Sequence, residues 1–259
     1  MKYAKKAAVV ATGIAMLFGT ANMTEAFAIQ TTNISAQEME TTKTPAVGKE
    51  AVEAAKAELS QKVRGTNGEN TGDTYLLYVS DPSLNGGSAF LYYLDMFKFT
   101  NYDDYLKQAA KLQGPVLQKP EGLPEGYKFE NGNIQPPIAK NLKEFQQEVK
   151  AEAEAQGKSV HYKKFEWNEM GEINLTFANG KDNLEMQVVH KLGRNTASSG
   201  YRYMKSTEVD AEQGKKIPGL VRNKLIWSDQ DHLYSITTNP GNPLTKDDLI
   251  KFAETAVKK

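Results

Sequence analysis

The chain has 259 residues, of which 32 are Lys or Arg and 32 are Asp or Glu, so its formal net charge at pH 7 is zero. This balance gives no sign of a nucleic-acid or acidic-polymer partner. The absence of cysteine excludes disulfides and thiolate metal sites, so stability must come from packing a core.

The first 28 residues have the pattern of a secretory signal peptide. Lysines in "MKYAKK" precede the apolar run "AAVVATGIAMLF", and small residues stand at Ala26 and Ala28. A spanning helix needs about 20 apolar residues, so the short run favours cleavage after Ala28 over retention as a membrane anchor. No cysteine follows the run, which excludes a lipid anchor there. We therefore expect a secreted, extracytoplasmic protein with no membrane span after cleavage.

Residues 29–73 are predicted to be a flexible leader that contains one amphipathic helix. The stretch "IQTTNISAQEMETTKTPAVG" is rich in Thr, Gln and Glu and has little apolar content. Val52, Leu59 and Val63 then recur at helical spacing, which predicts a helix from Lys49 to Arg64. This segment is either a spacer or interaction arm, or a helix that packs on the edge of the following domain.

The main domain is predicted to span residues 74–259 and to begin with two strands. Both strand segments are rich in aromatic and aliphatic residues: 75–80 and 88–99. A short helix is expected over 101–112, capped by Thr100 or Asn101. A loop rich in Pro and Gly then enters a strand at Tyr127, and a charged amphipathic helix over 136–158 ends near Gly157.

The second half of this domain is predicted to be a run of short strands closed by a helix. Residues 159–167 and 171–180 are expected to form a hairpin, which continues as a meander through 183–193. Further strands are expected at 201–207, 223–229 and 232–239. The last helix is capped by Thr245, with Asp248 three residues later.

The stretch "LIWSDQDHLYSITTNP" is interpreted as a hairpin and not as a catalytic cluster. Leu225 and Trp227 stand at alternate positions of a strand-like run, and "SDQD" has the composition of a turn. We expect Trp227 to pack in or beside the core. His232 is expected to lie exposed at the edge of the turn.

Two segments resemble a known family. "NYDDYLKQAAKLQGPVLQKPEGLPEGYKF" is similar to the opening, and "LIWSDQDHLYSITTNPGNPLTKDDLIKFAETAV" to the end, of an extracytoplasmic domain of unknown function, family 4367. The similarity covers roughly Thr100 to Lys259. Such domains occur in secreted or membrane-tethered proteins of spore-forming Gram-positive bacteria, often behind a zinc-binding anti-sigma segment and a transmembrane helix, neither of which is recognised in this sequence. The resemblance implies an α+β fold, with a curved, mainly antiparallel sheet and flanking helices, and it brings no known catalytic residues.

Familiar catalytic and metal-binding patterns are missing. Neither G-x-S-x-G nor S-x-x-K occurs. The three histidines, His161, His190 and His232, have no local ligand spacing. The segment from Asp81 begins like a calcium-binding loop, but Tyr92 occupies the position that needs a bidentate Glu.

Two further sets of residues remain as weaker candidates for a site. The paired acids Glu166 with Glu169, and Asp229 with Asp231, suit glycoside hydrolysis only if they face each other across a cleft. The aromatic residues of the first strands either line an apolar groove or form ordinary sheet core: Tyr75, Tyr78, Phe90, Tyr92, Tyr93, Phe97 and Phe99. No catalytic, cofactor-binding or metal-binding residue is predicted, and no cofactor.

The sequence favours a secreted, non-catalytic envelope protein that binds a ligand or a protein. The partner is expected to be an envelope protein or an apolar or glycan ligand held on the concave face of the sheet. One alternative is an envelope hydrolase that uses an unrecognised carboxylate pair. Another is a regulatory module that restrains a membrane partner. A cleft with converging titratable groups would favour the enzyme, and an open patch or groove would favour the binding module.

Overall fold

The computed structural model describes residues 48–64, 71–138, 142–191, 200–208, 215, 219 and 221–258. The expected signal peptide and the leader up to Val47 lie outside these residues, so both stay predictions. No helix in the described ranges is long and apolar enough to cross a membrane. Helices and mainly antiparallel sheets confirm the predicted α+β class.

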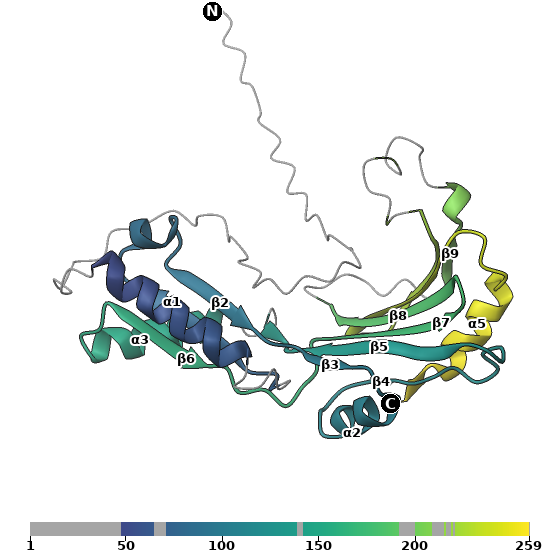
Figure 1. The fold of residues 1–259 in the computed structure, drawn as a ribbon, viewed down its shortest axis with the longest axis horizontal. Helices are drawn as coiled ribbons and strands as arrows, with labels where there is room; N and C mark the ends of the chain where they lie inside the picture. Colours follow the sequence, from purple (N-terminus) through teal and green to yellow (C-terminus); the bar gives the residue numbers. More distant parts are fainter. Residues whose placement is uncertain are drawn as a thin grey trace, which may run out of the picture.

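A three-stranded antiparallel sheet forms one end of the fold (Figure 1). Strand β1 (Thr74–Val79) lies in its centre, between β2 (Phe90–Leu94) and β6 (Val160–Lys164). All six residues of β1 except Tyr75 are buried, as expected for a strand with both faces covered. Two helices, α1 (Lys49–Arg64) and α3 (Leu142–Ala155), supply that cover.

The two helices contact opposite faces of this small sheet. On the α1 side, Val52 and Leu59 are fully buried against Leu77 and Val79. On the α3 side, Val149 and Ala153 share a second cluster with residues of the other parity: Leu76, Tyr78 and Tyr92. Alternate strand residues point to opposite faces, so one apolar strand supplies two cores. The predicted helix over Lys49–Arg64 is thus present and packs on the sheet.

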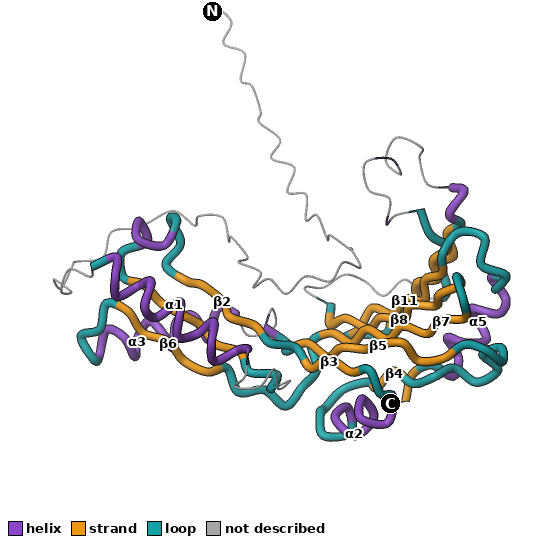
Figure 2. The backbone as a smooth tube through the Cα atoms, in the orientation of Figure 1, coloured by secondary structure: helices purple, strands orange, loops and turns teal. Residues whose placement is uncertain are grey.

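A seven-stranded sheet forms the rest of the fold, in the order β3-β5-β7-β8-β11-β10-β9 (Figure 2). Its strands are β3 (Phe97–Phe99), β5 (Lys128–Gln135), β7 (Glu172–Asn179), β8 (Asp182–His190), β9 (Arg202–Met204), β10 (Asn223–Ser228) and β11 (His232–Thr238). The predicted hairpin across "SDQD" is β10 and β11, which pair from Asn223 with Thr238 to Ser228 with Leu233.

One face of the large sheet packs on the main hydrophobic core. Helices α2 (Tyr102–Ala109) and α5 (Lys246–Thr255) lie on this face, together with the short pair β4 (Val116–Leu117) and β12 (Val257–Lys258). Strand residues of one parity meet α2 and α5 in a single cluster: Ile134, Ile173, Leu175, Phe177, Leu184, Met186, Val188, Leu225, Tyr234 and Ile236. The alternation of buried and half-buried residues along β7 and β8 reflects this one-sided cover.

Side-chain caps start both helices as the sequence predicts. The Asn101 side chain accepts hydrogen bonds from the backbone N–H groups of Asp103 and Asp104. Thr245 and Asp248 form a reciprocal capping box at α5. Each cap satisfies N–H groups that have no partner inside the helix.

Two strand predictions are wrong, and both concern the passage between the sheets. Residues 88–99 are not one strand, because β2 pairs with β1 in the small sheet and β3 pairs with β5 in the large one. Segments 159–167 and 171–180 do not form a hairpin, because β6 pairs with β1 whereas β7 pairs with β5 and β8. Partners distant in sequence decide both cases, and a local pattern does not specify them.

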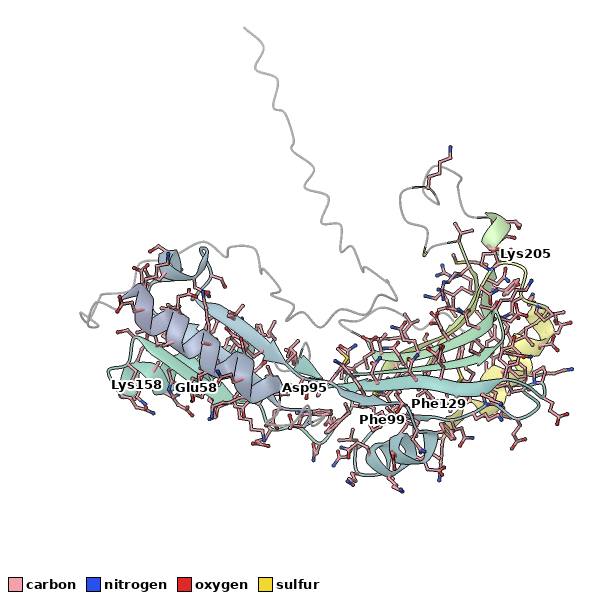
Figure 3. All side chains as sticks on the ribbon, in the orientation of Figure 1. Glu58, Asp95, Phe99, Phe129, Lys158 and Lys205 are labelled. Carbon is pink, nitrogen blue, oxygen red and sulfur yellow. The ribbon has the colours of Figure 1, made fainter. Side chains whose placement is uncertain are left out.

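The two sheets meet at a junction made of Gly72, Asp95, Phe97 and Trp167. The Asp95 carboxylate, near the narrow passage in Figure 3, accepts hydrogen bonds from the backbone N–H groups of Thr71 and Gly72. Trp167 donates its indole N–H to the Gly72 carbonyl at 3.1 Å and contacts Phe97, with ring centroids 5.5 Å apart. Burial raises the pKa of Asp95, and the bonds from Gly72 and Thr71 oppose that rise. The loop before β1 is therefore held between the sheets.

Candidate functional site

The face of the large sheet that points away from α2 and α5 has no described helix over it and carries mainly polar side chains. We call it the polar face. It is made by strand residues whose parity is opposite to that of the core, and these include Lys98, Asn131, Asn133, Gln135, Glu172, Asn174, Thr176, Ala178, Asn183, Glu185, Gln187, Val189, Arg202, Met204, Lys224, Ile226, Ser228, Leu233, Ser235 and Thr237. A one-sided antiparallel sheet normally exposes polar residues here, so the candidate site depends on how they are arranged.

One row of directly opposed residues crosses every strand of this sheet. In register order the row is Lys98, Asn133, Asn174, Gln187, Ser235, Ile226 and Arg202. With neighbouring strands about 4.8 Å apart, the row is about 29 Å long. Carboxamides occupy its second to fourth positions, the buried Ser235 and then Ile226 the next two, and a cation stands at each end. We call it the amide row.

Hydrogen bonds fix the side chains in the middle of the amide row. Asn174 donates from Nδ2 to the side-chain oxygen of Asn133 at 3.1 Å and to Glu172 Oε1 at 2.7 Å. Gln187 donates from Nε2 to the same Glu172 oxygen at 2.8 Å. All four side chains are half-buried. A ligand would meet donors and acceptors whose rotamers are already restricted, which lowers the entropy cost of binding.

A charged group lies beside the row, towards β9. Glu185 forms an ion pair with Arg222, just ahead of β10. Burial lowers the pKa of the neighbouring Lys224, an effect that Glu185 opposes and Arg202 reinforces. The polar face also carries an apolar pair, Leu233 opposite Val189, and Leu233 is 40% exposed.

Near Lys98 the surface is hollowed between β3 and α2. The depression has a volume of about 410 Å³, and Lys98, Lys107 and Lys111 contribute to its lining. Two of these lysines already have partners on their own helix, since Lys107 contacts Asp104 and Lys111 contacts Gln108. The depression lies at the edge of the sheet between β3 and α2, and Lys98 is the one residue that it shares with the amide row.

A second group of chemically capable residues lies at the β10–β11 turn, on the core face. We call it the turn cluster: Trp227, Asp229, His190, His232 and Tyr234. Asp229 accepts hydrogen bonds from the Tyr234 hydroxyl at 2.7 Å and from the His232 backbone N–H at 2.7 Å. Trp227 stacks on Tyr234, with ring centroids 5.3 Å apart and planes 13° apart. Trp227 thus packs beside the core, as predicted.

The structure overturns the expectation that His232 is exposed. Its side chain is only 18% exposed, and its ring centroid lies 5.4 Å from that of His190, the residue directly opposite on β8. Burial lowers the pKa of His232, and the nearby Asp229 opposes this. The alternation of β11 places His232 on the same face as Tyr234, which the turn composition did not reveal.

The turn cluster is built to hold the turn together. Nδ1 of His232 lies 3.4 Å from Asp229, an arrangement that in hydrolases orients a general base. The ring neighbours of His232, however, are His190 and Tyr234, and no described group of three His, Asp or Glu side chains could hold a metal ion. Burial raises the pKa of the Asp229 carboxyl, but the hydrogen bonds from the Tyr234 hydroxyl and from the backbone N–H groups of His232 and Asp231 together outweigh it and lower the pKa. Asp229 therefore stays ionised as the acceptor of the turn.

The other sequence candidates do not converge. Glu166 is exposed beside Lys164, and Glu169 lies on the loop that bridges to Gln113. His161 contacts Glu152 of α3, at the small sheet. No described contact joins the carboxylates of Glu166 and Glu169 or brings either of them to His161.

The calcium-like segment and the aromatic residues have structural roles. Asp81 caps a short 3₁₀ helix (Pro82–Asn85) by accepting from the Ser83 N–H and hydroxyl, and Gly86 ends it with φ 62°. The aromatic residues of β1, β2 and β3 pack within the clusters already described: Tyr75, Tyr78, Phe90, Tyr92, Tyr93, Phe97 and Phe99. Of these, Phe97 and Phe99 also line the depression beside α2.

Sequence reasoning did not single out the amide row. Its signal was present as polar residues at every second position of three predicted strands: Glu172 and Asn174, Glu185 and Gln187, Ser235 and Thr237. Such alternation indicates one exposed face, but the strand register is needed to align the residues into a row.

Comparison with known proteins adds no identity. No family model matches the chain, and no curated protein or solved structure is significantly similar to it. The resemblance to the extracytoplasmic family 4367 therefore stays a prediction.

Proposed function

We propose that this protein is a non-catalytic binding module that holds a hydroxyl- and amide-rich glycan of the cell envelope along the amide row. The observation that carries the proposal is the row itself, which crosses all seven strands on the face that no described helix covers. A linear ligand lying across the strands would meet the half-buried carboxamides of β5, β7 and β8 in turn.

The chemistry of the row favours a polar, mainly uncharged polymer. Carboxamides offer both donors and acceptors, which suits sugar hydroxyls and acetamido groups. Glu172 is held by Asn174 and Gln187 and can accept further hydrogen bonds through its other oxygen. An apolar ligand would leave these groups without partners, at a cost in free energy. The cations Lys98 and Arg202 stand at the ends, where an occasional acidic substituent would meet them.

The extracytoplasmic location in this proposal rests on the signal-like N-terminus. A glycan-binding role agrees with it, because such polymers surround an exported protein. The hydrolase alternative draws no support from the paired acids, since Asp229 is engaged by the turn and Glu166 is 81% exposed. The regulatory alternative rests on no specific contact in the described residues.

Calorimetric titration with soluble cell-wall glycan fragments tests the proposal. Gln187→Ala should weaken binding about fivefold or more, because one good hydrogen bond contributes about 1 kcal/mol net. Gln156→Ala, at an exposed position at the end of α3, is the matched control and should bind like the wild type. No heat of binding with any glycan, or equal affinity for the two variants, would contradict the proposal.

A further inference from the structure

The small sheet has two edge strands of opposite character. Strand β6 reads VHYKK, and its lysines are engaged in ion pairs with Glu148, Glu152 and Asp73. Strand β2 reads FLYYL and carries no charged side chain. Lysines on an edge strand discourage pairing with another chain, so β6 is protected and β2 is not.

The direction of the β2 backbone groups follows from its pairing with β1. Val79 donates its N–H to Ala89 O, and Asp95 donates its N–H to Asp73 O. Both contacts involve odd-numbered residues of the β2 segment. Because the backbone groups of successive strand residues alternate in direction, those of Phe90, Tyr92 and Leu94 point away from β1, towards the open edge.

One of these three residues is already satisfied. The Ser88 hydroxyl donates to Phe90 O at 2.7 Å and accepts from the Phe90 N–H at 3.2 Å. For Tyr92 and Leu94, no described residue supplies a backbone partner on this side. Figure 1 likewise draws no described element beyond β2. Among the described residues, two N–H and two C=O groups on this uncharged edge therefore have no backbone partner.

We propose that β2 pairs antiparallel with β2 of a second copy of this chain, which joins the two small sheets into one continuous sheet. Pairing about a two-fold axis at Tyr93 sets Tyr92 opposite the partner's Leu94, and Leu94 opposite the partner's Tyr92. Each such pair exchanges two hydrogen bonds. The register uses the four available groups and leaves the Ser88 cap in place.

Chemical self-complementarity identifies the second copy as the occupant. When β2 pairs with an identical strand, Tyr92, Tyr93 and Leu94 face only uncharged residues, so no like charges are brought together. The pair of Tyr93 side chains across the axis is also favourable, as cross-strand aromatic pairs generally are. The equivalent pairing of β6 with itself would gather Lys163, Lys164 and His161 around one axis. Closed two-fold dimers are also the commonest form of association between identical chains. This interface is distinct from the polar face, so it does not depend on the proposed function.

A proline substitution at Leu94 tests the interface with the full chain. Proline replaces the side chain, fixes φ and removes the backbone N–H, which at this position points away from β1, and edge strands tolerate proline there. Leu94→Ala is the matched control, because it removes the same side chain but keeps the N–H. Val160→Pro places the same change at an outward-facing position of the other edge, β6.

Sedimentation velocity over a concentration series should show dimerisation of the wild type, Leu94→Ala and Val160→Pro, and a monomer for Leu94→Pro. A wild type that stays monomeric, or a Leu94→Pro variant that dimerises equally, would overturn the proposal. Amide hydrogen exchange of the wild type gives a second measurement that needs no variant. Exchange at Tyr92 and Leu94 should slow as protein concentration rises. Protection that is independent of concentration would mean that another segment of the same chain covers the edge, and would also overturn it.

Discussion

At the scale of single residues, the environment of His232 differs most from what its sequence suggests. It lies between His190 and Asp229, and burial lowers its pKa. A histidine whose pKa is lower in the folded than in the unfolded state takes up protons preferentially on unfolding. The neutral form of His232 therefore stabilises the fold fully at a pH above the pKa that this residue has in the unfolded chain. This stabilisation decreases as the pH falls from that value towards the lower pKa of the folded state.

We expect the wild type to lose stability relative to His232→Gln as the pH falls from 7.5 to 5. Urea unfolding at several pH values measures the difference between the two proteins, so titrations common to both cancel. The side chains that face His232 are His190, Asp229 and Tyr234, with Asp231 nearby. A difference that does not change with pH, or that changes in the opposite direction, would show that His232 is not held neutral by burial.

At the scale of elements, the junction between the sheets depends on a close approach that only glycine permits. Gly72 has φ 66°, and a Cβ there would lie 2.4 Å from the Phe97 ring. Gly157, after α3, has nearly the same φ of 61° but has no atom within 4 Å of such a Cβ. Both positions carry a similar backbone penalty for alanine, and only Gly72 adds a clash.

Gly72→Ala should therefore cost about 1–3 kcal/mol more than Gly157→Ala, which is the typical cost of overpacking. Chemical denaturation of both variants measures this. The Gly72→Ala variant should also show altered near-ultraviolet circular dichroism, because the Phe97 ring must shift and it contacts Trp167. Equal costs for the two variants would mean that the junction yields without strain.

At the scale of the whole molecule, α1 is part of the folded unit. Val52 and Leu59 have no exposed surface, and Leu77 and Val79 of β1 lie beneath them. Burying a Val or Leu side chain contributes about 1.5–3 kcal/mol. If the folded unit began at Thr74, the face of the small sheet that α1 covers would be open to solvent.

Deletion of residues 1–47 should leave the thermal midpoint nearly unchanged, whereas deletion of residues 1–64 should lower it by at least about 10 °C. The shorter deletion tests the prediction, made from composition, that residues 29–47 do not pack into the hydrophobic core. Circular dichroism melts of the two truncated proteins and the full chain measure both effects. A drop of more than several degrees with the shorter deletion would show that the leader packs on the fold.

The sequence by itself determined the features that depend on neighbouring residues. Helical spacing located α1, the side chains of Asn101, Thr245 and Asp248 marked two helix starts, and "SDQD" located the β10–β11 hairpin. These patterns lie within a few residues of one another, so local sterics and hydrogen bonding specify them.

Only the tertiary structure decided which strands pair and what meets across them. Segment 88–99 divides between two sheets, and β6 pairs with β1 across about eighty residues of chain. The amide row and the contact of His190 with His232 both depend on register between strands that are far apart in sequence. An alternating pattern shows which residues share a face, but the partner of each strand is set by packing of the whole core, which no local pattern encodes.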